Sequence, residues 1–349
     1  MLGSASVVTR RAELAGFIVP DSPAGGGNVA ETFVALAADG KLTLPSPGTG
    51  RTTERFAALA EMAAVDLSLG RLVEGHTDAA AILAEAGRPA PPGTVMGVWA
   101  ARRGDADVTA TAVTGGWRLQ GRKPWASGAH LLTHALVTAA TATGHRLFLV
   151  PVSDPGVEAV DGTWPAVGMA MSDSVDVTFA IVVTADACVG GPGWYVDRPG
   201  FWFGSVGVAA CWMGGAIGLV RALAADLGGR GAPNAHQLAN LGAAAARCAA
   251  MARHVEWAAR LIDADPDDPD RAIRAVALEV RHLVEDGCLD VAVRVGRAGG
   301  AGPLCRDAAQ ARRYADLPVY IRQHHGELDA EALGRLVLDG DSRAARGSA

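Results

Sequence analysis

The chain is poor in lysine and in aromatic residues, and it has no concentration of positive charge. Aromatic residues make up 5% of its 349 residues, and Lys41 and Lys123 are its only lysines. The net charge is -6, and the arginines are scattered along the chain instead of forming the basic stripe that a phosphate backbone attracts. We therefore expect no nucleic-acid partner.

The cysteines also lack the pattern of a metal site or a disulfide framework. No two of them form a CxxC pair, and their spacing is wide and irregular. They are Cys188, Cys211, Cys248, Cys288 and Cys305. This usage predicts no metal and a reducing compartment, with the cytoplasm as the expected location. The first residues lack the apolar core and cleavage signature of a signal peptide.

A single hydrophobic run is long enough to span a membrane. The 22 residues from Pro199 to Val220 carry no charge. However, five glycines interrupt the run between Gly204 and Gly218, and no aromatic belt flanks it. We interpret it as a buried helix of a helical bundle and predict no membrane span.

What is present is ample apolar material in three regions of different character. Half of the residues are hydrophobic, enough for two or three structural units. The periodicity predicts a helical domain at 1–93, a β-domain at 94–193, a helical bundle at 194–340 and a tail at 341–349. The first boundary lies at the breaker RPAPPG, residues 88–93. The expected fold class is α+β, mostly α, with a middle antiparallel β-sandwich or barrel and a C-terminal four-helix bundle.

Individual elements follow from the same pattern. Expected helices cover residues 29–38, 53–64, 68–86, 201–227, 235–263, 270–297, 304–316 and 328–338. Expected strands cover residues 94–99, 108–113, 117–120, 135–139, 146–152 and 175–183. Asp66 or Ser68 is a suitable N-cap for the third helix.

The segment GWRLQGRKPWASGA, residues 116–129, is the most informative in the chain. Two strand-like runs meet at Gly121, and a Trp-Ala-Ser-Gly turn follows. A flat aromatic ring and free backbone donors at such a turn suit a planar cofactor. The alternative is a tryptophan packed at a sheet edge and a serine that caps a turn.

This segment is similar to one in acyl-CoA dehydrogenase-type flavoproteins, and four other segments extend the resemblance in the same order. They are DLSLGRLVEGHTDAAAIL (66–83), FLVPVSDPGVEAVDGTWPAVGMAMSDSVDVTF (148–179), GGAIGLVRAL (214–223) and RVGRAGGAG (294–302). In that family the first of these lines the acyl pocket and the last approaches the adenosine half of FAD. The resemblance implies the α, β, α plan of the family over most of the chain.

The resemblance also implies FAD as cofactor and names the residues that would hold it. Trp125 would cover the flavin ring, and Ala126 and Ser127 would donate hydrogen bonds to it. Gly299, Gly300 and Gly302 would let the backbone approach the nucleotide, although glycines in this position also simply end helices. Arg230 and Gln237, in RGAPNAHQ, stand where the family has the Arg-x-x-Phe-Gly that reaches the FAD phosphates across a subunit contact.

The catalytic segments of the family are altered in this chain. Its hydroxyl-bearing loop is replaced by WAARRGDADV (99–108), and its catalytic glutamate has no counterpart in YADLPVYIRQHHGELD (314–329). His324 falls nearest to the glutamate position, with His325 beside it. An imidazole there could take a substrate α-proton or exchange a proton during oxygen activation. The alternative is two solvated loop residues.

The leading hypothesis is therefore an FAD-dependent α,β-dehydrogenation of an acyl-CoA or another acyl thioester. A flavin-dependent monooxygenase on the same fold is the enzymatic alternative. A degenerate subunit without flavin, paired with an active homologue, is the non-enzymatic one. The resemblance further implies a homodimer or homotetramer, or a hetero-oligomer with a homologous subunit.

Overall fold

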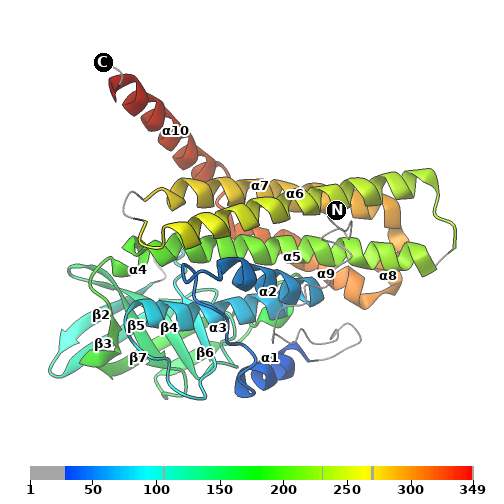
Figure 1. The fold of residues 1–349 in the computed structure, drawn as a ribbon. Helices are drawn as coiled ribbons and strands as arrows, with labels where there is room; N and C mark the ends of the chain where they lie inside the picture. Colours follow the sequence, from blue (N-terminus) through cyan, green and yellow to red (C-terminus); the bar gives the residue numbers. More distant parts are fainter. Residues whose placement is uncertain (1–27, 105–106, 230, 269–270, 348–349) are drawn as a thin grey trace.

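The structure, a computed structural model, describes residues 28–104, 107–229, 231–268 and 271–347, without the side chains beyond residue 339. A β-sheet lies at one end, and long helices run side by side away from it (Figure 1). Helical and strand regions follow each other in the predicted order, so the predicted α+β class is confirmed.

Three helices precede the sheet: α1 (Val29–Ala38), α2 (Thr52–Val65) and α3 (Leu67–Glu85). Asp66 caps α3, because its side chain accepts a hydrogen bond of 3.0 Å from the backbone N–H of Leu69. Of the two N-cap candidates, the structure uses Asp66.

The sheet is mixed, which corrects the prediction of a wholly antiparallel β-domain. Its strands are β1 (Met96–Trp99), β2 (Val108–Val113), β3 (Gly116–Lys123), β4 (His134–Thr141), β5 (Gly144–Pro151), β6 (Val157–Val160), β7 (Asp176–Thr184) and β8 (Cys188–Val189). The order is β6-β7-β3-β2-β4-β5-β8, with β1 beside β4. β4 is parallel to β1 and to β2, whereas the remaining pairs are antiparallel. Sequence patterns reveal a strand but not its neighbour, so these parallel pairings were not predictable.

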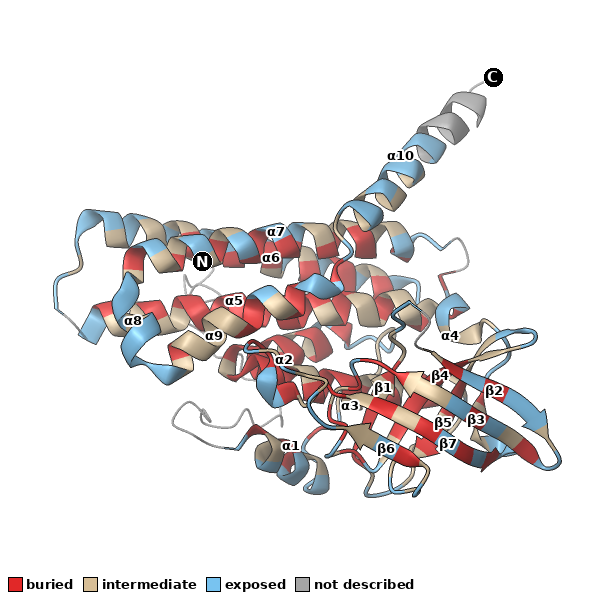
Figure 2. Ribbon diagram, turned by 180° about the vertical axis from the view of Figure 1, so that it is seen from behind, coloured by how far each residue is buried: buried red, intermediate tan, exposed pale blue. Residues whose placement is uncertain are grey.

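The second helical region begins after β8 and is built around α5 (Pro199–Gly229). The others are α4 (Trp194–Asp197), α6 (Ala235–Ala264), α7 (Ile273–Gly299), α8 (Ala301–Arg306), α9 (Ala308–Tyr320) and α10 (Glu327–Gly347). α5 contributes more buried residues than any other described helix, and it has helices on several sides (Figure 2). The last helix continues to Gly347, so most of the segment expected as a tail is helical.

Glycines bring α5 close to α2. A Cβ added to Gly214 would overlap the backbone oxygen of Ala60, and one added to Gly218 would lie 2.6 Å from that of Ala64. Although α5 is apolar and long enough to cross a membrane, 83% of its most hydrophobic stretch is buried inside the fold. The glycines that interrupt the run thus serve helix packing, as expected for a core helix.

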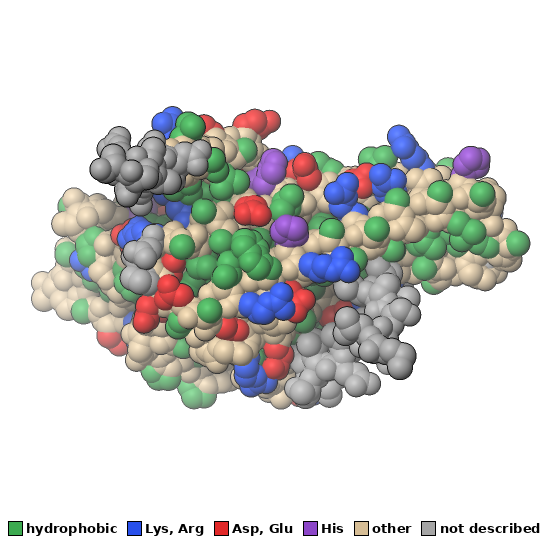
Figure 3. All heavy atoms as spheres, turned by 45° about the horizontal axis from the view of Figure 1, so that its top comes forward, with side chains coloured by type: hydrophobic (Ala, Val, Ile, Leu, Met, Phe, Trp, Pro, Cys, Tyr) green, Lys and Arg blue, Asp and Glu red, His purple; other side chains and the backbone are tan. Residues whose placement is uncertain are grey.

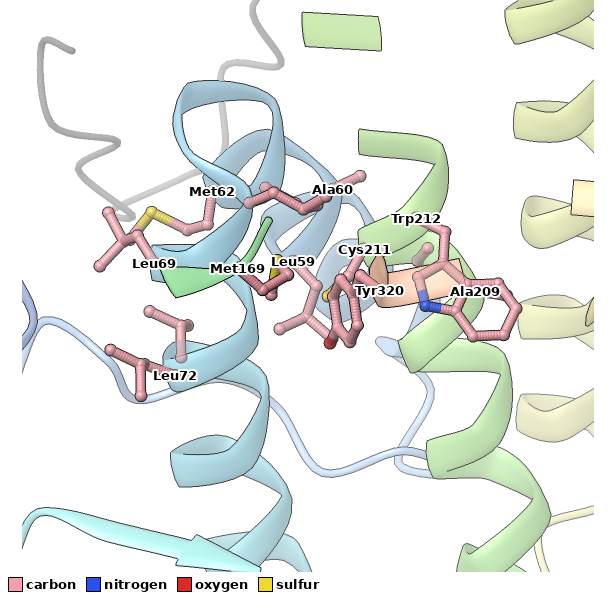
Figure 4. Close-up of a cluster of buried hydrophobic side chains, with 14 of the residues drawn as sticks. Leu59, Ala60, Met62, Leu69, Leu72, Met169, Ala209, Cys211, Trp212 and Tyr320 are labelled. Carbon is pink, nitrogen blue, oxygen red and sulfur yellow. The ribbon is translucent and has the colours of Figure 1, made fainter. Parts of the chain in front are cut away.

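The three regions of the sequence share one core. A single cluster of buried apolar side chains extends from α1 to the segment after α9 and includes residues of the sheet. Figure 4 shows a part of it, to which Leu69 and Leu72 of α3, Met169 of a loop, Trp212 of α5 and Tyr320 of α9 all contribute. The boundaries at residues 93 and 193 separate kinds of element but not independent cores.

Candidate active site

The turn after β3 presents an exposed tryptophan in a strained conformation. Trp125 has a φ of +54°, in the left-handed region that bulky residues rarely adopt, and remains 44% exposed. Its backbone N–H points to Asp176, 3.4 Å away, and Asp176 pairs with Arg122 at 2.7 Å. Strain of this kind persists where the surroundings impose it, often at functional sites.

A chain of serine hydroxyls fixes the rest of the turn. Ser172 donates to the backbone oxygen of Met169, so its own oxygen must accept from Ser174, 2.8 Å away. Ser174 in turn accepts from Ser127 at 2.8 Å. Because each hydroxyl has one proton, Ser127 can offer a ligand only an acceptor.

Backbone contacts complete the support of this turn. The N–H of Ala126 donates to Val175 O at 2.9 Å, and Trp99 donates from Nε1 to Ser127 O at 3.0 Å. The expectation of free donors at Ala126 and Ser127 does not match this geometry. The turn therefore offers a ligand two contacts, the indole ring of Trp125 and the hydroxyl oxygen of Ser127.

Helix α9 holds the loop that supports the turn. The carboxyl of Asp316 accepts from the Met169 N–H at 2.5 Å and is 1% exposed. Gly168 allows this approach, because any Cβ there would overlap the backbone oxygen of Ala315. Burial raises the pKa of Asp316 to about 6. Sequence reasoning missed this residue, since only the fold brings α9 to the loop.

A buried cluster of charges lies on α3, the helix expected to line an acyl pocket. Glu74 is 5% exposed and pairs with Arg71, and Tyr320 donates to its Oε2 at 3.2 Å. Burial raises the pKa of Glu74 to about 7; the cation of Arg71 opposes this shift and the carboxyl of Asp78 adds to it. Asp78 pairs with Arg55 of α2 at 2.6 Å. We call these five residues the α3 ion cluster.

The charges of the α3 ion cluster are arranged as two pairs, each with one carboxylate and one guanidinium. Arg55 is 1% exposed and also donates to Thr77 at 3.2 Å and to Pro45 O at 3.1 Å. The thiol of Cys211 on α5 lies in the same interior, and burial raises its pKa well above the ordinary value. These charged groups are partners for one another inside the fold, as buried charges require.

The two adjacent histidines lie in different surroundings. His324 is buried against the ring of Trp212, and its Nδ1 lies 3.0 Å from Asp329 Oδ2. Its Nε2 is 3.4 Å from Nδ1 of His282. The side chain of His325, by contrast, is 68% exposed. Burial lowers the pKa of His324, and the nearby Arg281 lowers it further.

Trp212 links His324 to the α3 ion cluster. Its ring is fully buried, packs edge-on against Tyr320, and is covered by the Arg281 guanidinium at 4.7 Å. Tyr320 contacts Glu74 on its other side. A chain of side-chain contacts therefore runs from Glu74 through Tyr320 and Trp212 to His324.

The residues expected to hold the adenosine half of FAD form a separate group. Gln237 donates from Nε2 to Ala298 O at 3.2 Å, next to the turn of Gly299, Gly300 and Gly302. A cleft of about 200 Å³ adjoins this turn. It is lined by Asp226, Gly302, Pro303, Arg306, Asp307 and Gln310. Figure 1 shows α8, which begins at this turn, at the end of the bundle remote from the sheet. Arg230 lies outside the described residues.

The altered loop at 99–108 contains charges in place of a hydroxyl. Asp107 accepts from Lys123 at 2.6 Å and approaches His145 at 3.0 Å, while Arg102 lies 3.4 Å from the same imidazole. Lys123 is completely buried and so anchors β3 just before the Trp125 turn. Within the described residues, no group of three histidine, cysteine or acidic side chains could hold a metal ion.

Residues 102–182 match the family described as acyl-CoA dehydrogenase, middle domain. No curated protein sequence matches the chain. Solved structures resemble it over most of its length. One is TdsC from Paenibacillus sp. A11-2 in complex with FMN and indole: identity is 19%, 89% of this chain and 95% of the other are covered, and the TM-score is 0.74.

Two further structures have comparable similarity. KijD3, in complex with FMN and a dTDP-linked amino keto sugar, is 21% identical over 91% of this chain and 96% of its own, with a TM-score of 0.72. The HsaA monooxygenase from M. tuberculosis is 19% identical over 88% of this chain and 91% of its own, with a TM-score of 0.74. At these identities the likeness establishes the fold and not the reaction. The chain therefore has the acyl-CoA dehydrogenase fold, and its residues 102–182 match the model of that family's middle domain.

Proposed function

We propose that the chain is a flavin-dependent monooxygenase that acts on a small substrate with hydrogen-bonding groups. The α3 ion cluster carries this proposal, because it places charges where an acyl chain would need an apolar wall. The fold is shared with TdsC, which is described as a dibenzothiophene monooxygenase, and with the HsaA monooxygenase.

The Trp125 turn fits a flavin ring. The exposed indole offers an aromatic face, and the hydroxyl oxygen of Ser127 can accept from a ring N–H. A reduced flavin bound there would supply the electrons for oxygen activation. The role of the protein is to hold the ring, exclude water and place proton-exchanging groups near the substrate.

We assign proton exchange to His324. Burial beside Arg281 favours the neutral imidazole, which can accept a proton from a substrate N–H, O–H or C–H group. Asp329, 3.0 Å from Nδ1, would stabilise the charged form that results. Tyr320 and Glu74 form the polar end of the same site.

The flavin can be FMN or FAD in this proposal. FMN is the flavin in the complexes of TdsC and KijD3, and in this chain the Trp125 turn would contact its ring. FAD would also need Gln237 and the glycines at 299, 300 and 302, which lie apart from Trp125 within one chain. A second copy would then supply them, so we further propose a homo-oligomer. The five free cysteines suit a reducing compartment such as the cytoplasm.

α,β-Dehydrogenation of an acyl thioester is the second candidate function. It is favoured by the buried carboxyls of Glu74 and Asp316, because burial raises the pKa of both into the range of a general base. This reaction would need an apolar path for the acyl chain that bypasses the α3 ion cluster.

Two assays separate these functions. We expect the purified protein to bind reduced FMN or FAD and to consume oxygen with formation of an oxygenated product from a polar substrate panel. In the absence of oxygen, acyl-CoAs of short to long chain should leave the absorption spectrum of the bound, oxidised flavin unchanged. Bleaching by an acyl-CoA would select the dehydrogenase instead. Absence of any flavin binding would favour the degenerate subunit.

Trp125→Ala is expected to weaken flavin binding about 2- to 13-fold, because an aromatic contact contributes about 0.5–1.5 kcal/mol. Titration with quenching of flavin fluorescence measures this without turnover. Trp257→Ala is the matched control, since Trp257 is a similarly exposed tryptophan (37%) on α6. Equal flavin affinities of the Trp125→Ala and Trp257→Ala proteins would show that Trp125 does not contact the flavin.

A further inference from the structure

The Trp125 turn continues to His130, whose ring faces two carboxyl groups. One oxygen of Asp173 accepts from the backbone N–H of His130 at 2.7 Å, and the other lies 2.8 Å from Nδ1 of the ring. Asp161 Oδ1 lies 3.3 Å from Nε2 of the same ring. A neutral imidazole carries one N–H and can donate to only one of these carboxylates, whereas an imidazolium donates to both. The geometry therefore favours the charged form of His130.

Asp173 connects His130 to the loop that supports the turn. The backbone oxygen of Asp173 accepts from the N–H of Ala129 at 3.2 Å, and that of Ser172 accepts from the N–H of Gly128 at 2.9 Å. Ser172 is also the first of the supporting serine hydroxyls. Asp173 has a φ of +48°, in the left-handed region, and such a conformation persists where the surroundings impose it. The two bonds to His130 are part of those surroundings.

Asp161 connects His130 to a second loop, which follows β6 and reaches the other end of the turn as well. Thr163 in this loop accepts a hydrogen bond of 2.7 Å at Oγ1 from the N–H of Asp176. The carboxyl of Asp176 faces the N–H of Trp125 at 3.4 Å. The loop thus contacts the turn at His130 and, through Asp176, at Trp125. Without the contact at Nε2 of His130, this loop would hold the turn at one end only.

Exposure alone does not single out His130. Figure 3 shows one face of the molecule, on which histidine side chains lie among apolar, basic and acidic ones. The side chain of His130 is itself 47% exposed, so each of its ion pairs contributes only modestly. What distinguishes it is that one ring joins three segments: the turn, the loop after β6 and the loop before β7. The hydrogen bond with Asp173 raises the pKa of His130, and the charges of Asp173 and Asp161 add to this effect, whereas partial burial opposes it.

We propose that His130 clamps the Trp125 turn by bridging Asp173 and Asp161, and that the clamp is tighter when the ring is protonated. These two carboxyls are the titratable groups that face the ring among the described residues. Because the pKa of His130 is raised, the contribution of the proton is complete below the ordinary value of 6.5 and is lost as the pH rises through the raised value. A flavin on the turn should then bind less tightly as the pH rises. That consequence rests on the proposed function, but the clamp itself does not.

Hydrogen exchange of the free protein tests the clamp without flavin. Protection of the Gly128 and Ala129 amides, corrected for the intrinsic exchange rate, should fall about 2- to 5-fold from about pH 6 to about pH 8.5, as expected for a half-exposed ion pair. His130→Gln should have the lower protection at both pH values, and His130→Arg, which stays charged, should keep the higher protection at both. His254→Gln on α6 is the matched control and should behave like the wild type, because Nδ1 of His254 lies 3.2 Å from a backbone oxygen of its own helix.

Titration with FMN at the same pH values measures the consequence for the flavin. The ratio of the dissociation constants of the wild type and His130→Arg cancels the ionisation of FMN itself, and it should rise about 2- to 5-fold over this range. Equal amide protection in the wild type and His130→Gln at the lower pH overturns the clamp. The same pH dependence of FMN affinity in the wild type and His130→Arg also overturns it. If none of these proteins binds FMN, the proposed flavin site fails, and hydrogen exchange alone decides on the clamp.

Discussion

His324→Ala is expected to lower turnover by about 10²- to 10⁴-fold, the usual contribution of a positioned acid–base group. Steady-state oxygen consumption with an accepted substrate measures it. His324 is buried against Trp212, and its Nδ1 lies 3.0 Å from Asp329 Oδ2. Imidazole added to the buffer should therefore not restore the activity of the alanine variant. His324→Asn should lose as much turnover. Asparagine keeps a polar side chain, but it cannot take up a proton.

The pH dependence separates a base from a structural residue. Burial lowers the pKa of His324, so the imidazole stays neutral below the ordinary value of 6.5. Turnover that needs the neutral form should therefore persist at pH 6.5 and decline at lower pH. That acid limb should vanish in the residual activity of His324→Asn.

His325→Ala provides the matched control for His324. Its side chain is 68% exposed, and its Nδ1 lies 3.7 Å from Asp329, the carboxyl that faces His324 more closely, at 3.0 Å. We expect nearly wild-type turnover. If His325→Ala is the variant that loses activity and His324→Ala keeps it, the assignment of the base is wrong.

Glu74→Gln is expected to become more stable relative to the wild type as the pH rises, by about 2–3 kcal/mol between pH 5 and 8.5. Burial raises the pKa of Glu74 from 4.5 to about 7. At 1.36 kcal/mol per unit, this shift corresponds to a difference of about 3 kcal/mol between the two protonation states. Urea unfolding of both proteins at the two pH values measures it.

The sign follows from proton binding. Between pH 4.5 and 7 the folded wild type binds a proton at Glu74 that the unfolded chain has released, so the stabilisation by that proton is lost as the pH rises through 7. Glutamine resembles the protonated carboxyl and has no such loss. The two proteins should thus be closest in stability at low pH.

An exposed glutamate provides the control, because its removal changes the charge of the protein without changing a buried group. Glu256→Gln on α6 removes a carboxyl that is about half exposed and paired only with Arg260. We expect it to change the free energy of unfolding by less than about 0.5 kcal/mol at either pH. Parallel stability profiles for Glu74→Gln and the wild type would show that Glu74 keeps its charge despite its burial.

Much of the fold could be predicted because it depends on local patterns. The change of period along the chain located most long helices and most strands within a few residues. It did not separate α8 from α9, and it ended α10 nine residues too early. The Asp66 cap, the buried run at α5 and the turn at Trp125 were visible for the same reason. The parallel neighbours of β4 were not, because strand pairing depends on segments distant in the sequence.

The residues of the candidate site also fall into those that the sequence indicated and those that only the fold revealed. Trp125 and His324 could be chosen from ordered resemblances along the chain. Glu74 and Arg71 looked like polar residues of an amphipathic helix, and Asp316 like another helix residue. Each became a candidate only when a distant helix or loop buried it: Tyr320 beside Glu74, and Met169 above Asp316.

By itself, the sequence determined that this protein alternates helix, sheet and helix and that a tryptophan stands in the turn after β3, because periodicity and turn chemistry act between near neighbours. Only the tertiary structure decided that His324 is buried while His325 is exposed, that Ala126 has already used its donor, and that the charges of α3 are buried as ion pairs. Burial and electrostatic environment are set by packing between remote segments, and they determine what a titratable group can do.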